Sequence, residues 1–248
     1  MYTTHTKYIA LGRQCDTVFN IKKYTQPDGP TQFFDWSRTD FKSVLDVLDM
    51  RDVDAVFAVD NLRLDFERFA KDGDLTICLK SFEAKGRTLM YHHDAKIADC
   101  LDPAGLEKTL GAFIGKYKRR FRRLVHAIRD PDARLCFVYR VSYDKDSDPD
   151  KSCAIDLAAD VPEFDRVLRQ INPDVVYCLV LLIEEEEEYD YMYTKYRNVL
   201  RINMSYFLRR DAQVDWMATR FDMETVHGII RQNAFSNLVT YKRSYQKT

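Results

Sequence analysis

Two long apolar runs separated by one helical pattern constrain the fold more than any other feature of this sequence. Residues 134–141, RLCFVYRV, and 175–183, VVYCLVLLI, are nearly continuous apolar stretches that are rich in β-branched side chains. Such runs are typical of strands that are buried on both faces of a sheet. Residues 161–171 between them repeat apolar side chains at helical spacing and end at the turn sequence NPD. Strand, helix and strand in this order predict a right-handed crossover between two parallel strands.

The same alternation extends over most of the chain. Further strand-like segments are 7–11, 53–59, 87–91 and 199–204, and further helical patterns cover 41–50, 103–129 and about 222–234. The pattern at 103–129 is the longest, with Pro103 at an early helical position and Pro131 after its end. The 248 residues, 46% of them hydrophobic, suffice for one substantial core. The sequence therefore predicts a single α/β domain over 1–248, in three layers around a mainly parallel sheet.

Composition excludes several classes of protein. The net charge of −1 gives the chain no general attraction to nucleic acid or membrane surfaces, so duplex nucleic acid is not expected as a partner. The longest apolar stretch, 175–183, is about half the length that spans a bilayer, and the first residues lack a signal-peptide pattern. The six cysteines are widely spread without a C-x-x-C pair, which argues against a zinc finger or a disulfide scaffold. We expect a soluble, reduced, cytoplasmic protein without a membrane span.

Reactive side chains follow the predicted strands. In an open parallel sheet, ligands bind beyond the carboxyl ends of the strands, so the residues at those ends are candidates for a functional site. These residues are Gly12, Arg13, Cys15, His92, His93, Asp94, Arg140, Glu184 and Asn203. The sequence therefore predicts a thiol, imidazoles, carboxylates and guanidinium groups at one edge of the sheet, with Arg140 as a candidate for substrate binding.

Cys15 is the candidate nucleophile. It stands in LGRQCD, after an apolar run that ends at Gly12 and where a helix is expected to begin. The first turn of a helix offers unpaired N–H groups and a positive dipole end, which lower the pKa of a thiol below its usual value of about 8.5. Arg13 would add to this effect, and Gly12 and Arg13 are also candidates for substrate binding. The alternative is that a small apolar side chain is needed here for packing.

A thiol nucleophile needs a base, and His92 and His93 are the candidates. The sequence does not distinguish between them. The carboxylate that orients the imidazole would be Asp94, the direct neighbour, or Asp16 or Asp35 from elsewhere in the chain. The alternative is that both histidines lie in a polar loop.

The segment FFDWS at 33–37 places Asp35 between aromatic side chains. In a functional interpretation, Asp35 is a base or a hydrogen-bond acceptor and Trp36 is a stacking wall for the substrate. In a structural interpretation, the segment is a turn with a helix N-cap nearby.

The segment KYKRRFRRL at 116–124 carries six positive charges on a helix whose apolar side chains form the buried stripe. A solvated helix surface explains these charges. The alternative is an anion-binding patch, with Arg119 and Arg120 as substrate-binding candidates. Five consecutive glutamates at 184–188 repel one another, and only Glu184 is placed to face the site. No metal-ligand spacing accompanies it, so neither a metal nor a cofactor is predicted.

Four of these motifs occur in a recognisable order: LGRQCD, FFDWS, HHD and KYKRRFRRL followed by LCFVYRV. This order resembles a family described as papain-like cysteine peptidases, whose members carry G-x-x-C-D, FDW, His-Asp and K-Y-x-R-R elements. The resemblance covers about residues 8–141. It implies Cys15 as the nucleophile and a histidine as the base, and His93 precedes Asp94 as in the His-Asp element. It also implies a papain-like α+β fold, an alternative that the strand and helix alternation makes less favourable.

Three functions are compatible with these observations. The first is a cysteine-dependent hydrolase or acyl transferase that uses Cys15 and a histidine on a small-molecule, peptide or glycan substrate. The second is a nucleotide-sugar-dependent glycosyltransferase that binds phosphates at the strand ends, although no G-x-G-x-x-G or Walker loop is present. The third is a binding module without catalysis, in which the basic helix docks an acidic partner.

Overall fold

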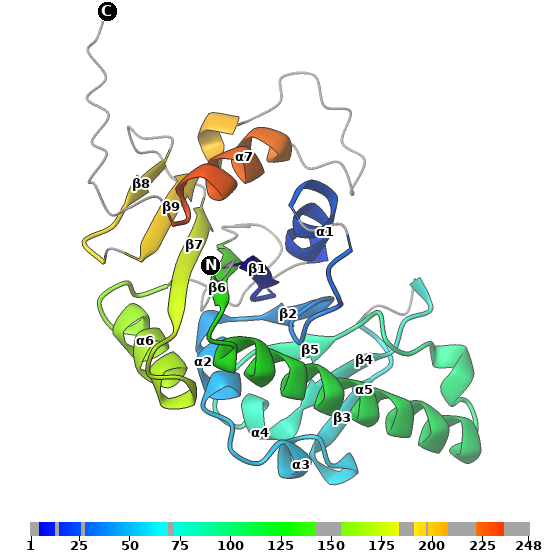
Figure 1. Cartoon of the computed structure of the whole chain (residues 1–248). Helices are drawn as coiled ribbons and strands as arrows, with labels where there is room; N and C mark the ends of the chain where they lie inside the picture. The colour runs from blue at the N-terminus through cyan, green and yellow to red at the C-terminus, as the bar shows by residue number, and fades with distance from the viewer. Residues whose placement is uncertain are drawn as a thin grey trace, which may run out of the picture.

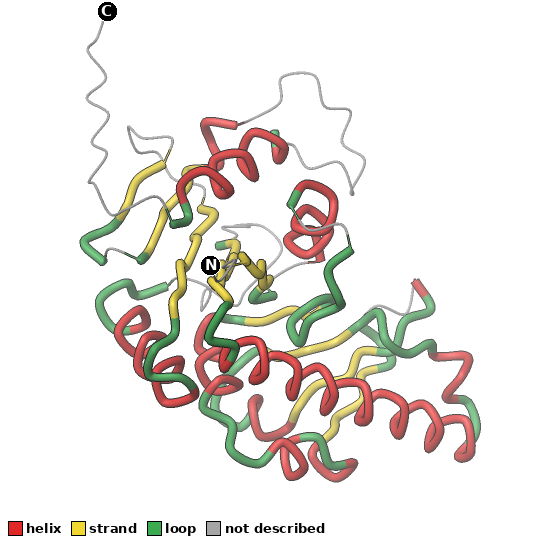
Figure 2. Tube along the Cα trace, in the orientation of Figure 1, coloured by secondary structure: helices red, strands yellow, loops and turns green. Residues whose placement is uncertain are grey.

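The computed structural model describes residues 5–12, 15–25, 28–68, 72–141, 155–183, 191–196, 198–207 and 222–235, with only the backbone described at 15, 16 and 191–193. The fold contains two sheets with helices packed around them (Figures 1 and 2). In this part of the chain, no helix is long and apolar enough to cross a membrane.

The first sheet is largely parallel. Its strands are β1 (His5–Ala10), β6 (Ala133–Arg140), β7 (Val176–Ile183), β9 (Val199–Asn203) and β8 (Tyr191–Tyr193), in the order β1-β6-β7-β9-β8. All neighbours pair in parallel except β8, which runs antiparallel to β9 at the edge. The two long apolar runs thus form β6 and β7, and the parallel crossover that the sequence predicts between them is confirmed.

The second sheet is antiparallel and was not predicted. It contains β2 (Ser37–Thr39), β5 (Leu89–Tyr91), β4 (Thr76–Leu79) and β3 (Leu62–Asp65), in the order β2-β5-β4-β3. The prediction of one mainly parallel sheet is therefore wrong for residues 37–91. The strand predicted at 87–91 is confirmed as β5, but β2, β3 and β4 were not predicted, because strands of three or four residues carry little periodicity and their pairing depends on neighbours distant in sequence.

One predicted strand is helical instead. Residues 53–59 form the single-turn helix α3 (Val53–Val56) and the start of the 3₁₀ helix η1 (Val59–Asn61). The side chain of Asp52 accepts hydrogen bonds from the backbone N–H groups of Asp54 and Ala55 and so caps this turn. An N-cap thus outweighs the β propensity of the valines.

Helices cover both faces of the parallel sheet. One face packs against α1 (Cys15–Tyr24) and α7 (Met223–Asn233), and the other packs against α2 (Phe41–Leu48), α5 (Pro103–Arg129) and α6 (Asp160–Ile171) (Figure 1). The remaining elements are α4 (Lys80–Glu83) and the 3₁₀ helices η3 (Ile97–Cys100) and η5 (Met204–Phe207). The helices predicted at 41–50, 103–129, 161–171 and 222–234 are confirmed, and a helix begins at Cys15 as expected.

The second sheet shares a core with the first. Buried side chains of β4 and β5 belong to the same cluster as those of β6, β7, α5 and α6. Helix α5 joins them, since Phe113, Tyr117 and Phe121 are buried along its length. Figure 1 shows α5 running along the antiparallel sheet before the chain enters β6.

Gly12 brings the carboxyl end of β1 against β2. Its φ of +83° lies in the left-handed region, and a Cβ at this position would stand 1.9 Å from Thr39 Oγ1. Thr39 Oγ1 donates a hydrogen bond to the carbonyl of Leu11 at 2.9 Å. The carboxyl end of β1 therefore lies against β2, the edge strand of the antiparallel sheet that follows the FFDWS turn.

Candidate functional site

The tryptophan of FFDWS and the histidines of HHD lie side by side. Ser37 of β2 is the register partner of Tyr91 of β5, so Trp36 and His92 occupy adjacent positions just outside the sheet. The ring of Trp36 stands edge-on to His93 with 6.2 Å between centroids, and the rings of His92 and His93 are 4.2 Å apart. Trp36 has a φ of +64°, which is uncommon for a residue with a side chain. This turn directs the indole towards the imidazole pair.

His93 is oriented by Asp74. Its Nδ1 lies 3.1 Å from Asp74 Oδ2, and Lys96 Nζ contacts the other carboxylate oxygen. The Asp74 side chain is 5% exposed, whereas that of His93 is 38% exposed. Burial alone would raise the pKa of Asp74, but hydrogen bonds from Lys96 and His93 outweigh burial and hold it below the ordinary value. An ionised, buried carboxylate thus faces one ring nitrogen of an accessible imidazole.

His92 has a different environment. It is only 9% exposed, and burial together with the neighbouring His93 lowers its pKa to about 4. Its imidazole is therefore neutral at neutral pH. Of the two candidate bases, His93 alone combines access to solvent with a carboxylate partner.

Asp94 contacts α5. Its carboxylate contacts Lys116 Nζ and accepts a hydrogen bond from Tyr117 Oη, and the Asp94 side chain is 5% exposed. Arg120 Nη1 donates to the same Tyr117 Oη at 3.0 Å. The arrangement favours a role in which Asp94 fixes the HHD loop on α5.

Asp35 is buried beneath the FFDWS turn. It is 1% exposed, and its Oδ2 accepts the backbone N–H of Gln32 at 2.8 Å. Burial raises its pKa, although Lys22, Arg120 and Arg123 act in the opposite direction. Arg120 Nη1 also lies 3.5 Å from the Asp35 carbonyl oxygen. These contacts favour a role for Asp35 in fixing the turn that presents Trp36.

The basic helix therefore has two faces. Its buried Arg120, with Lys116 and Tyr117, holds the FFDWS and HHD segments together. Arg119 lies on the exposed face of α5, where it remains a candidate for binding an anion.

Cys15 is the first residue of α1, directly after the connection from β1. Its thiol and the whole of Arg13 lie outside the described residues, as does Glu184. Trp36 packs against the cluster that contains Val18 and Ile21 of α1. Trp36 thus contacts His93 on one side and the α1 cluster on the other.

The remaining strand ends lie along the parallel sheet. Arg140 ends β6 and is half-buried, and Asn203 ends β9 and is fully buried. Among the described side chains, no group of three histidine, cysteine, aspartate or glutamate residues lies close enough to hold a metal ion.

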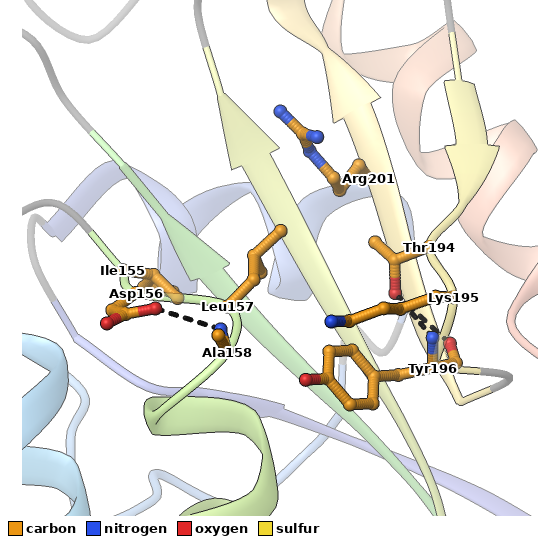
Figure 3. Close-up of a pocket in the computed structure, with 8 residues that line it drawn as sticks. All are labelled: Ile155, Asp156, Leu157, Ala158, Thr194, Lys195, Tyr196 and Arg201. Atoms are coloured by element: carbon orange, nitrogen blue, oxygen red, sulfur yellow. Dashed lines mark hydrogen bonds between the residues drawn. The ribbon is translucent and has the colours of Figure 1, made fainter.

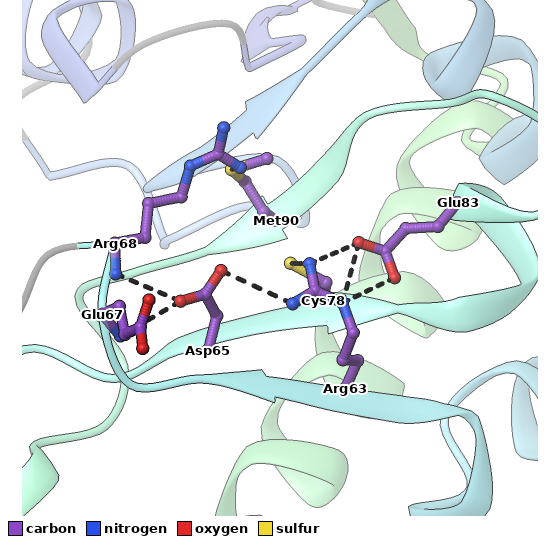
Figure 4. Close-up of polar contacts among 7 residues, drawn as sticks. All are labelled: Arg63, Asp65, Glu67, Arg68, Cys78, Glu83 and Met90. Carbon is purple, nitrogen blue, oxygen red and sulfur yellow. Dashed lines mark hydrogen bonds and ion pairs between the residues drawn. The ribbon is translucent and has the colours of Figure 1, made fainter.

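The other described cysteines have unreactive environments. Cys78, Cys100, Cys136 and Cys178 are free and buried. Burial raises the pKa of Cys178 to about 12. Burial also raises the pKa of Cys78 to about 11, even though its Sγ lies 3.4 Å from Arg63 Nη2 (Figure 4). That guanidinium is bound to the carboxylates of Asp65 and Glu83, which reduces its effect on the thiol.

Sequence reasoning missed Asp74. It lies 19 positions before His93, in a turn between β3 and β4, and nothing in its local sequence, KDGDL, marks it as a partner of an imidazole. The isolated bridge between Asp74 and Lys96 brings the two segments together. The contact between Asp74 and His93 follows from the pairing of β4 with β5, which the local sequence does not show.

No protein-family model matches this sequence, and neither the curated proteins nor the solved structures contain a significant match to the chain. Any assignment of activity therefore depends on the geometry of the site.

Proposed function

We propose that the protein is a cysteine-dependent hydrolase or acyl transferase in which Cys15 is the nucleophile and His93 is the base. One observation carries the proposal: an accessible imidazole has one ring nitrogen bound to a buried, ionised carboxylate. This is the arrangement of base and orienting group that activates thiol and hydroxyl nucleophiles. The resemblance of the sequence motifs to a family described as papain-like cysteine peptidases supports the same assignment of Cys15.

Asp74 defines the role of each nitrogen of His93. A carboxylate at Nδ1 favours the tautomer that carries its proton there, which leaves the lone pair on Nε2. Nε2 then takes the proton of the Cys15 thiol, and the thiolate attacks a substrate carbonyl carbon. The imidazolium, stabilised by Asp74, returns the proton to the leaving group. Water or another acceptor then releases the acyl group from the sulfur.

The backbone supports this pairing of Cys15 with His93. Gly12 approaches Ser37, Ser37 pairs with Tyr91, and His92 follows directly. Three residues span at most about 11 Å, so Cys15 begins α1 within that distance of Gly12. A thiol at the first turn of α1 would be stabilised as thiolate by the helix dipole, and free N–H groups there would stabilise an oxyanion.

Trp36 is the proposed substrate wall, because its half-buried indole borders His93. The substrate class stays broad: a small molecule, a peptide or a glycan that presents a carbonyl group.

The test is the rate of alkylation at each cysteine from pH 5 to 9, with the modified residues identified by mass spectrometry. We expect Cys15 to react faster than Cys78, Cys100, Cys136 and Cys178, because these four side chains are buried. His93→Gln should slow Cys15 alkylation at neutral pH about tenfold or more, while His126→Gln, an exposed histidine of α5, should leave it unchanged. Equal rates for Cys15 and the buried thiols would refute the proposal.

A nucleotide-sugar-dependent glycosyltransferase is the second candidate. The four parallel strands favour it, since phosphates bind at the carboxyl ends of such sheets and Arg140 ends β6. The burial of Asp35 weighs against that residue as the base for an acceptor hydroxyl. Binding of nucleotide sugars to a protein with an unreactive Cys15 would favour this candidate. A protein that neither binds them nor has a reactive thiol would be the binding module.

A further inference from the structure

A cavity lies beside the β8 edge of the parallel sheet. It has a volume of about 640 Å³ and lies between residues 155–158, which precede α6, and the β8–β9 hairpin (Figure 3). None of its lining residues belongs to the group around His93. The volume lies within the range of about 300–1,000 Å³ that is typical of small-molecule sites.

The walls of this cavity are apolar on one side and aromatic on the other. Ile155 and Leu157 line one side, and Tyr196 of the hairpin lies on the opposite side (Figure 3). Thr194 fixes the hairpin, because its Oγ1 accepts the N–H of Tyr196 at 3.1 Å and donates to the carbonyl of the same residue at 3.2 Å. The aromatic wall is therefore held in place by the turn that carries it.

The charges that line the cavity favour an anion. Lys195 brings an exposed positive charge, and its Nζ lies 5.1 Å from the centre of the Tyr196 ring. The carboxylate of Asp156 accepts the N–H groups of Ala158 and Ala159, so it is engaged at the start of α6. Within the described part of the chain, no carboxylate lies within ion-pair distance of Lys195 Nζ. A cation next to an aromatic ring suits a ligand that combines a flat ring with a negative group.

We propose that this cavity binds a small organic anion in which a flat ring carries a phosphate or a carboxylate. The ring lies against Tyr196 and the apolar side chains of Ile155 and Leu157, and the anionic group binds Lys195. Nucleoside monophosphates and aryl carboxylates share this chemistry. The site is independent of the acyl transfer proposed for Cys15, so either proposal can fail without the other.

Calorimetry on the whole chain tests the proposal with adenosine monophosphate and with benzoate, which distinguish the two sources of the ligand. We expect at least one to bind with a dissociation constant below about 1 mM. If adenosine monophosphate binds, adenosine and inorganic phosphate alone should bind at least about tenfold more weakly, because each makes only half of the contacts.

Two variants locate the binding. Lys195→Gln removes the exposed cation and should weaken binding about tenfold, and Tyr196→Leu removes the aromatic wall and should weaken it about fivefold. Lys108→Gln on the exposed face of α5 is the matched control and should change nothing. The proposal is overturned if neither ligand binds at about 5 mM, or if both cavity variants bind as tightly as the unaltered protein. Circular dichroism of each variant checks that it is folded.

Discussion

The parallel and antiparallel sheets differ in how well the local sequence predicts their strands. Strands β6 and β7 are eight residues each and almost wholly apolar, and helix α6 connects them. Strands β2 and β5 are three residues each, and they meet only because distant segments pair. Local sequence therefore predicts long buried strands well, whereas the formation of short antiparallel strands depends more on the side chains packed around them.

The comparison also separates the parts of the proposed site. Cys15 begins the helix that follows β1 of the parallel sheet, whereas Trp36, Asp74 and His93 lie at the ends of the antiparallel strands. Gly12 forms one contact between the two sheets. The proposed chemistry would thus require both sheets to be docked, and the following predictions test how firmly they are joined.

The largest expected effect on stability comes from truncating one buried leucine in each sheet. Leu179 of β7 and Leu79 of β4 are both fully buried in the shared core. Leu179→Ala and Leu79→Ala should each lower the free energy of unfolding by about 3 kcal/mol. Because the core is continuous, denaturant unfolding should remain a single transition by fluorescence and by circular dichroism. Two separate transitions in the Leu79→Ala protein would show that the sheets unfold independently.

Removing the carboxylate of Asp94 should have a similar or slightly smaller effect. Asp94→Ala leaves Lys116 and the buried Tyr117 hydroxyl without their shared acceptor, at a cost of about 2–3 kcal/mol. Asp99→Ala, in the exposed turn nearby, is the control and should cost less than about 0.5 kcal/mol. Urea unfolding measures both. Equal stability of the two variants would contradict the anchoring role of Asp94.

Gly12→Ala should lower the free energy of unfolding by about 2 kcal/mol, because it disturbs the contact between the sheets. The added Cβ would clash with Thr39 Oγ1, and a positive φ is unfavourable for alanine. Adding Thr39→Ala removes the clashing atom and should recover part of the loss. Thermal unfolding of the single and double variants measures this recovery. If the effects of the two substitutions on stability simply add, the close approach of Gly12 to Thr39 does not limit stability.

The smallest effect is a pH dependence shared by both sheets. Burial lowers the pKa of His92, beside the antiparallel sheet, and of His227, in α7 against the parallel sheet, to about 4 each. The unfolded chain binds these protons with a pKa of about 6.5, so stability is present above pH 6.5 and is lost as the pH falls towards 4. Each imidazole should contribute about 1.5 kcal/mol to this loss between pH 6.5 and 5.

His227→Gln and His92→Gln should each reduce the fall in stability between pH 6.5 and 4. Urea unfolding at several pH values, with exposed His126→Gln as the control, measures the difference. Since Thr25 Oγ1 lies 2.7 Å from His227 Nδ1, His227→Gln also tests the contact between α1 and α7. A pH dependence that neither substitution alters would assign the acid sensitivity to carboxylates instead.

The sequence by itself determined the parallel sheet, the four longer predicted helices and the start of α1 at Cys15, because buried strands and amphipathic helices follow from the local order of apolar side chains. It also named His92, His93 and, as a separate candidate, Trp36, which the structure places next to one another. It did not determine the antiparallel sheet, and it offered Asp94, Asp16 and Asp35 where Asp74 binds His93. Asp74 reaches His93, 19 residues later in the chain, because β4 pairs with β5. The carboxylate of Asp94 binds α5 instead. Which carboxylate reaches which imidazole is a property of tertiary structure, since a hydrogen bond forms only when packing brings its two atoms within about 3 Å.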